Sequence, residues 1–379
     1  MEVLSGDKPL VFASASAAEG GLKKNKGSRV QASPLRSLLP LALLVALSAT
    51  IIASVCLGAV PIAPGELLSI LAHKAGLSDS ANFQEHQEAV LLTLRLPRVL
   101  LGVLVGAGLA VSGAAMQGLF RNPLAEPGLI GISSGASVSA ATVIVLGNRF
   151  FSGYLDHLGY YGLSLVAFLG AALTTLLVYR ISVYRGTAVM TTLLLAGIAI
   201  NALTGSFTGL LTYVAKDDEL RSLTFWGLGS LGGASWDAVA VLLPFVAVPL
   251  VCLPFLSRAL NVLALGEAQA AHAGVNLLKL KRAIVILSTM AVGASVAMCG
   301  MIGFIGLVVP HLVRMITGAA HERVIPNAAL MGAAVLSLSD LLARTIVAPA
   351  ELPIGIVTAL IGGPVFIYII LKEKKGASR

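Results

Sequence analysis

Charge is scarce in this sequence. Only 12% of the 379 residues are charged and 57% are hydrophobic, whereas a soluble globular domain carries about 25% charged residues. This composition excludes a soluble enzyme, a disordered chain and a nucleic-acid-binding domain. The formal net charge of +8 must therefore be interpreted through the position of each Lys and Arg relative to a membrane.

The sequence also lacks the motifs of common catalytic and metal sites. Three cysteines in apolar runs, Cys56, Cys252 and Cys299, support neither a disulfide framework nor a metal site. No Gly-Lys dipeptide occurs, which excludes a phosphate-binding P-loop. A Gly-x-Ser-x-Gly match from Gly131 to Gly135 opens an apolar helix, without the strand and turn of a nucleophile elbow. We expect no catalytic residue, no metal site and no covalently bound cofactor, so the chain is not an enzyme by itself.

Long apolar runs dominate what is present. A membrane-spanning helix needs about 20 mainly apolar residues. Clear runs cover about 38–58, 100–119, 129–147, 161–181, 189–213, 237–257, 327–347 and 353–371. The run at 283–316 is long for one span and has basic residues at both ends, so we interpret it as a hairpin of two short helices. We predict an all-α integral membrane protein of about ten transmembrane helices with both termini cytoplasmic.

The predicted topology divides the chain further. Helices 2–5 and 7–10 would be two units of opposite orientation, a common plan of transporters. Glycine pairs four residues apart, Gly102 with Gly106 and Gly131 with Gly135, predict close contact between helix backbones.

Polar sequence marks the two ends of the chain. Residues 1–37 have too little apolar surface to fold, so we predict a disordered cytoplasmic tail there. A transmembrane domain follows over 38–372, and residues 373–379 form a second cytoplasmic tail.

Three polar segments interrupt the apolar pattern. Arg95 and Arg98, at the outer end of helix 2, indicate either an acidic external partner or anchoring at the interface. Segment 121–136, on the inner side, contains two prolines and forms either a gate lining or a simple turn. Segment 260–282 has the pattern of two short amphipathic helices broken near Gly274. Its apolar surface needs a partner, for which a cytoplasmic ATPase is a natural candidate.

One acidic residue, Asp340, clearly lies within a predicted span, and Arg344 follows four residues later on the same helix face. This spacing favours a locally paired structural charge. A proton relay is the alternative.

These segments, in this order and spacing, resemble the FecCD/BtuC-type permeases, the membrane subunits of type II ABC importers for iron chelates, haem and cobalamin. The resemblance covers about residues 36–372. The most specific matching stretches are LRLPRVLLG, RNPLAEPGLIGISSGA, LALGEAQAAHAGV, GFIGLVVPHLVR and AELPIGIVTALIGGPVFI.

The resemblance implies an assembly in the bacterial inner membrane. Two permease subunits would form a homodimer, two cytoplasmic ABC ATPase subunits would use ATP, and a periplasmic substrate-binding protein would dock outside. The docking residues implied are Arg95, Arg98 and Arg344. The implied ATPase contacts are Leu265, Gly266, Glu267, Ala271 and Gly274. The implied cytoplasmic gate comprises Asn122, Pro123 and Leu124, together with Met190, Thr191 and Thr192 in the loop before helix 5. The implied pathway residues are Asn201, Phe225 and Trp226.

The implied substrate is haem, because QGLFRNPL, GIAINALTG and LTFWGLGSLGGASW are most similar to haem permeases. A ferric siderophore and cobalamin are the alternatives. Segment 221–236 should form a short helix near the path entrance, where Phe225 and Trp226 contact a flat ligand or anchor the chain at the interface. The rival class is a proton-coupled secondary transporter, which requires uptake without an ATPase and loss of activity in Asp340→Asn.

Overall fold

A computed structural model describes residues 34–77, 83–150 and 155–377. Most of the predicted N-terminal tail therefore lies outside the described residues. The first helix begins at Pro34, four residues before the predicted span, and the last helix continues to Ala377, into the predicted C-terminal tail.

The described chain is almost entirely helical. Its helices are α1 (Pro34–Cys56), α2 (Pro64–Lys74), α3 (Glu85–Ala89), the π-helical turn η1 (Val90–Arg95), α4 (Leu96–Phe120), the 3₁₀ turn η2 (Pro127–Ile130), α5 (Ile132–Phe150), α6 (Leu155–Ser182), α7 (Met190–Val214), α8 (Asp217–Leu228), α9 (Trp236–Phe255), α10 (Ser257–Ala264), α11 (Glu267–His272), α12 (Leu277–Cys299), α13 (Ile305–Thr317), α14 (His321–Thr345) and α15 (Ile354–Ala377). Between α6 and α7, strands β1 (Val183–Tyr184) and β2 (Thr187–Ala188) form a small antiparallel hairpin.

The prediction of ten apolar helices is confirmed. Within the described residues, eight helices are long and apolar enough to cross a membrane, and part of α5 and the whole of α13 add two shorter ones. The run at 283–316 is a hairpin, with α12 and α13 joined by residues 300–304. The predicted helix 2 corresponds to α4, which begins at Leu96 and continues from α3 and η1 without a break.

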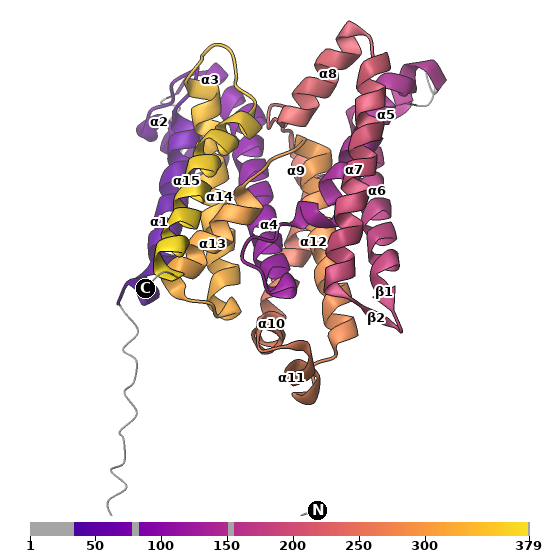
Figure 1. Cartoon of the computed structure of the whole chain (residues 1–379). Helices are drawn as coiled ribbons and strands as arrows, with labels where there is room; N and C mark the ends of the chain where they lie inside the picture. The colour runs from indigo at the N-terminus through magenta and orange to yellow at the C-terminus, as the bar shows by residue number, and fades with distance from the viewer. Residues whose placement is uncertain (1–33, 78–82, 151–154, 378–379) are drawn as a thin grey trace, which may run out of the picture.

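The two predicted units pack in corresponding ways. Helix 2 of the first unit (α4) packs against α13 and α14, which are helices 8 and 9 of the second unit. Helix 7 of the second unit (α12) packs in turn against α5 and α6, helices 3 and 4 of the first. Figure 1 shows the resulting two groups of helices, with α4 between them, α8 across one end, and α10 and α11 at the other.

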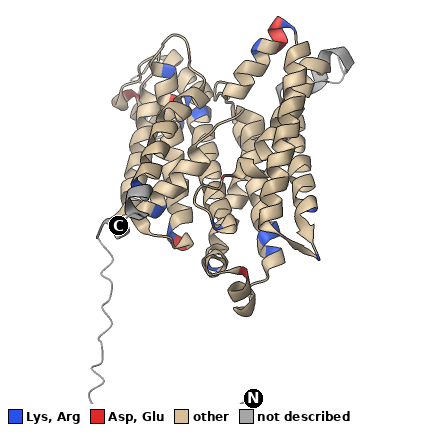
Figure 2. Ribbon diagram, viewed as in Figure 1, with Lys and Arg blue, Asp and Glu red and all other residues tan. Residues whose placement is uncertain are grey.

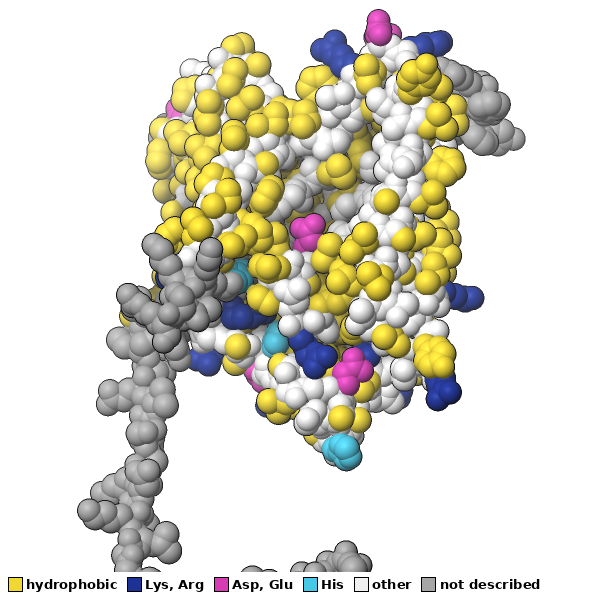
Figure 3. All heavy atoms as spheres, viewed as in Figure 1, with side chains coloured by type: hydrophobic (Ala, Val, Ile, Leu, Met, Phe, Trp, Pro, Cys, Tyr) yellow, Lys and Arg dark blue, Asp and Glu magenta, His cyan; other side chains and the backbone are white. Residues whose placement is uncertain are grey.

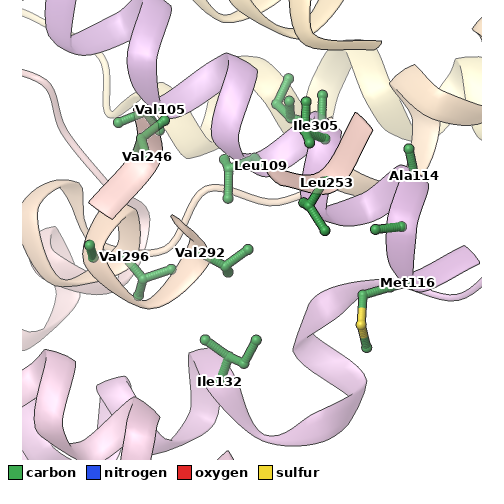
Figure 4. Packing of buried hydrophobic residues seen from close by; sticks show 14 of the residues in the cluster. Val105, Leu109, Ala114, Met116, Ile132, Val246, Leu253, Val292, Val296 and Ile305 are labelled. Atoms are coloured by element: carbon green, nitrogen blue, oxygen red, sulfur yellow. The ribbon is translucent and has the colours of Figure 1, made fainter. Parts of the chain in front are cut away.

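Helix α4 forms the centre of the core. Nearly every residue from Leu101 to Leu119 is buried, because small and apolar side chains occur all around this helix. Figure 4 shows Val105 and Leu109 of α4 close to Val246 of α9 and Val292 of α12. The remaining surface suits a lipid environment. In Figure 2 most charged residues lie toward the two ends of the molecule, and in Figure 3 hydrophobic side chains extend over the height between them.

Close backbone contacts occur at several glycines. A Cβ on Gly106 would lie 2.3 Å from the carbonyl oxygen of Gly332 in α14, and one on Gly135 would lie 2.6 Å from the carbonyl oxygen of Gly170 in α6. Both contacts confirm the predicted packing role. A Cβ on Gly102 would make only ordinary contacts, at 3.4 Å from the Leu231 side chain, so this member of the first pair does not make a close backbone contact.

Candidate functional site

The end of the molecule that carries α10 and α11 presents the segment expected to contact an ATPase. The break between its two short helices lies at Leu265–Gly266, not near Gly274 as predicted. Gly266 adopts φ +131°, a backbone conformation that strains any side chain with a Cβ, which favours glycine here. Gly274 has φ +82° and follows the end of the second helix, with no atom near its missing Cβ.

The outer surface of this segment exposes apolar side chains. Leu260, Leu263 and Ala270 are buried against the helix bundle, whereas Leu265 is 73% exposed and Ala271 is exposed. An exposed leucine at a polar end of a membrane protein is available to a protein partner.

A buried lysine connects this segment to the base of α7. Lys281, near the start of α12, is 1% exposed, and its Nζ donates to Oε2 of Glu267 at 2.8 Å and to the carbonyl oxygen of Ala188 at 2.8 Å. Glu267 is the first residue of α11, and Ala188 ends β2, two residues before Met190. One ammonium group thus joins the predicted ATPase contact to the strand that leads into the predicted gate.

The other half of the segment is tied to α14. Asn261 of α10 accepts a hydrogen bond from the backbone N–H of His321 at 2.9 Å, and its Oδ1 lies 2.7 Å from Nδ1 of the same residue. Its side-chain amide also contacts Glu322 at 2.5 Å. A movement of α10 would therefore displace the first turn of α14 through these hydrogen bonds.

The segment after α4 is irregular, as its prolines predict. Arg121 adopts a left-handed conformation with φ +51°, and the side-chain oxygen of Asn122 accepts the backbone N–H of Leu124 at 2.9 Å. Leu124 is 41% exposed, while Pro123 is half-buried. The segment is a hydrogen-bonded turn that exposes the side chain of Leu124.

The second predicted gate element lies in a helix, and its placement in a loop was wrong. Met190, Thr191 and Thr192 form the first turn of α7, since the β1–β2 hairpin occupies the preceding connection. Met190 and Thr192 are half-buried and Thr191 is exposed.

The predicted pathway residues lie on two different helices, Asn201 on α7 and Phe225 and Trp226 on α8. Asn201 of α7 is half-buried; its Nδ2 donates to the carbonyl oxygen of Gly128, and its Oδ1 accepts the Ser134 hydroxyl at 2.5 Å. This side chain therefore fixes α7 against η2 and α5. On α8, Phe225 is 53% exposed, whereas Trp226 packs partly against the core. The helix near the entrance covers Asp217–Leu228 and not 221–236, because a turn over 229–235 precedes α9.

A cavity of about 550 Å³ lies between η2, the end of α8, the α12–α13 turn and α15. It is lined by Glu126 and Pro127, by Gly227 and Leu228 at the end of α8, and by residues of the α12–α13 turn and of α15. Figure 3 shows a hollow on the viewed face between the two groups of helices. Glu126 is the ionisable residue among the described lining side chains, and burial raises the pKa of its carboxyl above the usual value.

All three predicted docking arginines line one outer cavity of about 240 Å³, but each guanidinium already has internal partners. Arg95 is 6% exposed and donates to the carbonyl oxygens of Val55, Cys56 and Val60. Arg344 donates to the backbone of Ser54 and Leu57.

Arg98 forms the centre of an ion-pair network. It contacts Asp340 at 2.9 Å and Glu351 at 2.8 Å, and Nε of Arg344 lies 3.7 Å from Asp340. The predicted pairing of Asp340 with Arg344 is confirmed, with Arg98 as the nearer partner. Three arginines face two carboxylates around this cavity, which leaves an excess positive charge.

Two connecting residues were missed by the sequence analysis. Lys281 lies in the basic cluster used only to set topology, and nothing in the sequence separates it from its exposed neighbours. Gln117 of α4 is 2% exposed; its Nε2 donates to the carbonyl oxygen of Leu307 at 3.0 Å, and its Oε1 accepts from Arg314 at 2.8 Å. A polar residue in the apolar run of α4 was the available signal.

Comparison with known proteins places this geometry in a family. The model of the FecCD transport family matches residues 44–372. The chain belongs to the FecCD transport family. A hemin transport system permease protein of Yersinia pestis, HmuU, is 47% identical over 287 residues, covering 76% of this chain and 84% of the relative. The vitamin B12 import system permease protein BtuC of Salmonella typhi is 40% identical over 341 residues, covering 90% and 96%.

A solved structure agrees with the fold. It is described as an inward-facing conformation of a metal-chelate type ABC transporter, with a TM-score of 0.76 and 32% identity, and it covers 89% of this chain and 99% of that one. The FecCD chain is thus a multi-pass permease of the ABC importer type, in the bacterial inner membrane.

Proposed function

We propose that this FecCD chain is the permease subunit of an ATP-driven importer that carries haem from the periplasm to the cytoplasm. Two copies would pair around the translocation path, with two ATPase subunits against α10 and α11. The greater identity to the hemin permease than to the vitamin B12 permease supports haem. A ferric siderophore or cobalamin is the alternative cargo of the same machinery.

The residues near the cavity of about 550 Å³ suit a large flat cargo. Its described lining is mainly apolar, and the exposed ring of Phe225 lies two residues before the lining residue Gly227. Such a surface offers low-affinity contact with an aromatic macrocycle. Tight binding is unnecessary, because a transport path must release its cargo.

The single observation that carries the mechanism is the bridge made by Lys281. When the ATPase moves α11, the bond to Glu267 displaces Lys281, and the bond to Ala188 passes that displacement to the base of α7. The bond to Ala188 is buried and receives little solvent screening, whereas the Glu267 side chain is 39% exposed and its bond is partly screened. The coupling segment and the gate therefore move as one unit.

A replacement of this lysine tests the mechanism. In the reconstituted complex with its ATPase and binding protein, Lys281→Met is expected to retain ATP hydrolysis and lower haem uptake roughly tenfold, a typical coupling effect. Lys281→Arg should restore part of the uptake. The matched control is Lys279→Met, an exposed lysine on the same helix turn, which should transport normally. Equal uptake by Lys281→Met and the control would refute the bridge.

A substrate panel tests the cargo. Proteoliposomes with the cognate ATPase would be loaded with haem-, ferric siderophore- or cobalamin-binding proteins, and ATP-dependent accumulation of each ligand measured. Uptake of haem alone supports the proposal. Uptake of a siderophore or cobalamin instead transfers the assignment to that ligand, and uptake without an ATPase would favour a secondary transporter.

We also propose that the excess positive charge around Arg98 attracts an acidic binding protein. Arg95 is buried, so the test changes Glu351 instead. Its side chain pairs with Arg98 and is 46% exposed. Glu351→Gln should raise the association rate of the binding protein and steepen its dependence on salt. An unchanged rate would remove these arginines from docking.

A further inference from the structure

A further cavity lies between α6 and α12, away from the residues assigned to transport. Its volume is about 710 Å³, and the two helices pack side by side. None of the proposed gate, pathway or ATPase-contacting residues lines it. Leu176 and Ile286 on its walls are 49% and 58% exposed, so the cavity opens on a surface with apolar side chains.

The cavity extends along one leaflet of the membrane. Its lining on α6 begins at Phe168, which packs edge-to-face on Phe245 of α9 with ring centroids 5.0 Å apart. It ends at Arg180, twelve residues later, a helical rise of about 18 Å. Half of the hydrocarbon thickness of a bilayer is about 15 Å. The cavity therefore matches the length of a single acyl chain.

The walls of the cavity are apolar even where threonines line them. The Thr175 hydroxyl donates to the carbonyl oxygen of Ala171 at 2.8 Å, and that of Thr289 donates to Val285 at 2.7 Å. Each hydroxyl is thus satisfied by its own helix and does not require a polar ligand.

Positive charge marks one end of the cavity. Arg180 lies in the last turn of α6 and Arg282 in the second turn of α12, at the end of the molecule that carries α10 and α11. Both are exposed, and neither guanidinium has an ion pair or hydrogen bond within the described part of the chain. Figure 2 shows basic residues at this end of the molecule.

A nearby hydroxyl also lacks a protein partner. Tyr179 lines the cavity beside Arg180, and its buried phenol oxygen has no hydrogen-bond partner among the described residues. Buried hydroxyls nearly always have one, so this oxygen is an unsatisfied polar atom in the wall of the cavity.

We propose that this cavity binds an anionic phospholipid of the cytoplasmic leaflet. One acyl chain occupies the space between α6 and α12, while Arg180 and Arg282 hold the phosphate through charge-assisted hydrogen bonds. The cytoplasmic leaflet supplies negatively charged headgroups at this depth, and basic pockets between helices select them. The site depends on the membrane orientation of the FecCD fold and is independent of the cargo.

Native mass spectrometry of the purified full chain tests the site. The protein would be exchanged into mixed micelles containing equal amounts of phosphatidylglycerol and phosphatidylcholine, and the retained lipids counted. We expect retention of phosphatidylglycerol in preference to phosphatidylcholine. The double variant Arg180→Gln/Arg282→Gln should lose that preference. The control Arg185→Gln/Lys279→Gln removes two exposed charges at the same end that do not line the cavity and should keep it.

Two further measurements make each outcome decisive. Leu176→Trp, which fills the cavity and keeps both arginines, should reduce the retained lipid. The absence of any preference in the unaltered protein overturns the proposal, even if the double variant does not fold. Equal loss in the control pair overturns it as well. A disulfide between two copies of Leu176→Cys would show that a second subunit covers the cavity, which also overturns it.

Discussion

The contact between α4 and α14 makes a quantitative prediction about two glycines on the same helix. A Cβ on Gly106 would lie 2.3 Å from the carbonyl oxygen and 2.8 Å from the carbonyl carbon of Gly332. Favourable contacts of heavy atoms lie at about 3.5–4.0 Å, so Gly106→Ala forces the two helices apart by roughly 1 Å. The clash is with backbone atoms, which cannot move aside as a side chain can.

The magnitude follows from two opposing effects. Overpacking costs about 1–3 kcal/mol, and separating α4 from α14 also weakens neighbouring contacts along the central helix. Replacing a helical glycine by alanine stabilises the helix by at most about 1 kcal/mol, because alanine has the higher helix propensity. We expect Gly106→Ala to destabilise the protein by about 2 kcal/mol. In Gly102→Ala the new Cβ meets side-chain atoms at 3.4 Å and 3.7 Å, so stability should be unchanged or slightly greater.

Thermal unfolding in detergent, followed with a thiol-reactive fluorophore, measures both variants. The reporter is Cys299, which is 3% exposed in the folded protein and becomes reactive on unfolding. We expect Gly102→Ala to melt at or above the melting temperature of the unaltered protein. Gly106→Ala should melt clearly below it. Equal melting temperatures for the two variants would refute the assignment of a close backbone contact at Gly106.

Three further predictions concern polar and close contacts. Asp340→Asn should lower stability by about 3 kcal/mol, since it leaves the buried side of Arg98 without its carboxylate; transport per folded molecule should remain ATP-dependent, and a specific loss of uptake at normal stability would instead indicate a proton relay. Gln117→Leu should cost about 2 kcal/mol in thermal unfolding, because a carbonyl and a guanidinium lose their partner, and an unchanged melting curve would contradict this. In Gly197→Ala the new Cβ would lie 1.9 Å from the carbonyl oxygen of Leu129, so α7 should detach from η2 and protease sensitivity should rise in this segment; normal protection would exclude the contact.

The outer arginines show how far residue patterns could define the site. The charge pattern singled out Arg95 and Arg98, the family resemblance added Arg344, and the three line one cavity. Their charges suggested an external partner, but Arg95 and Arg344 both donate to carbonyl groups that follow the end of α1 or belong to it, and Arg344 also contacts the Ser54 hydroxyl and Asp340. Carbonyl oxygens occur in every residue, so no sequence pattern distinguishes a carbonyl that accepts an arginine from one that does not.

The coupling segment gives a second example. Amphipathic patterning correctly indicated two short helices, yet their break was assigned to the wrong glycine. Gly266 and Gly274 both adopt positive φ, and a sequence shows only that glycine permits such conformations. Lys281 was counted as one of several basic residues near a membrane, although it alone is buried among Lys279, Lys281 and Arg282.

The sequence by itself determined the number, order and orientation of the transmembrane helices, because bilayer thickness fixes the length of an apolar run and basic residues remain on the cytoplasmic side. Both are properties of continuous stretches of chain. Tertiary structure alone decided which glycines bring helices into contact, which arginines are enclosed, and which lysine joins the ATPase-facing helix to the base of α7. Those properties depend on atoms far apart in the chain: 93 residues separate Lys281 from Ala188, and only folding brings the two to hydrogen-bonding distance.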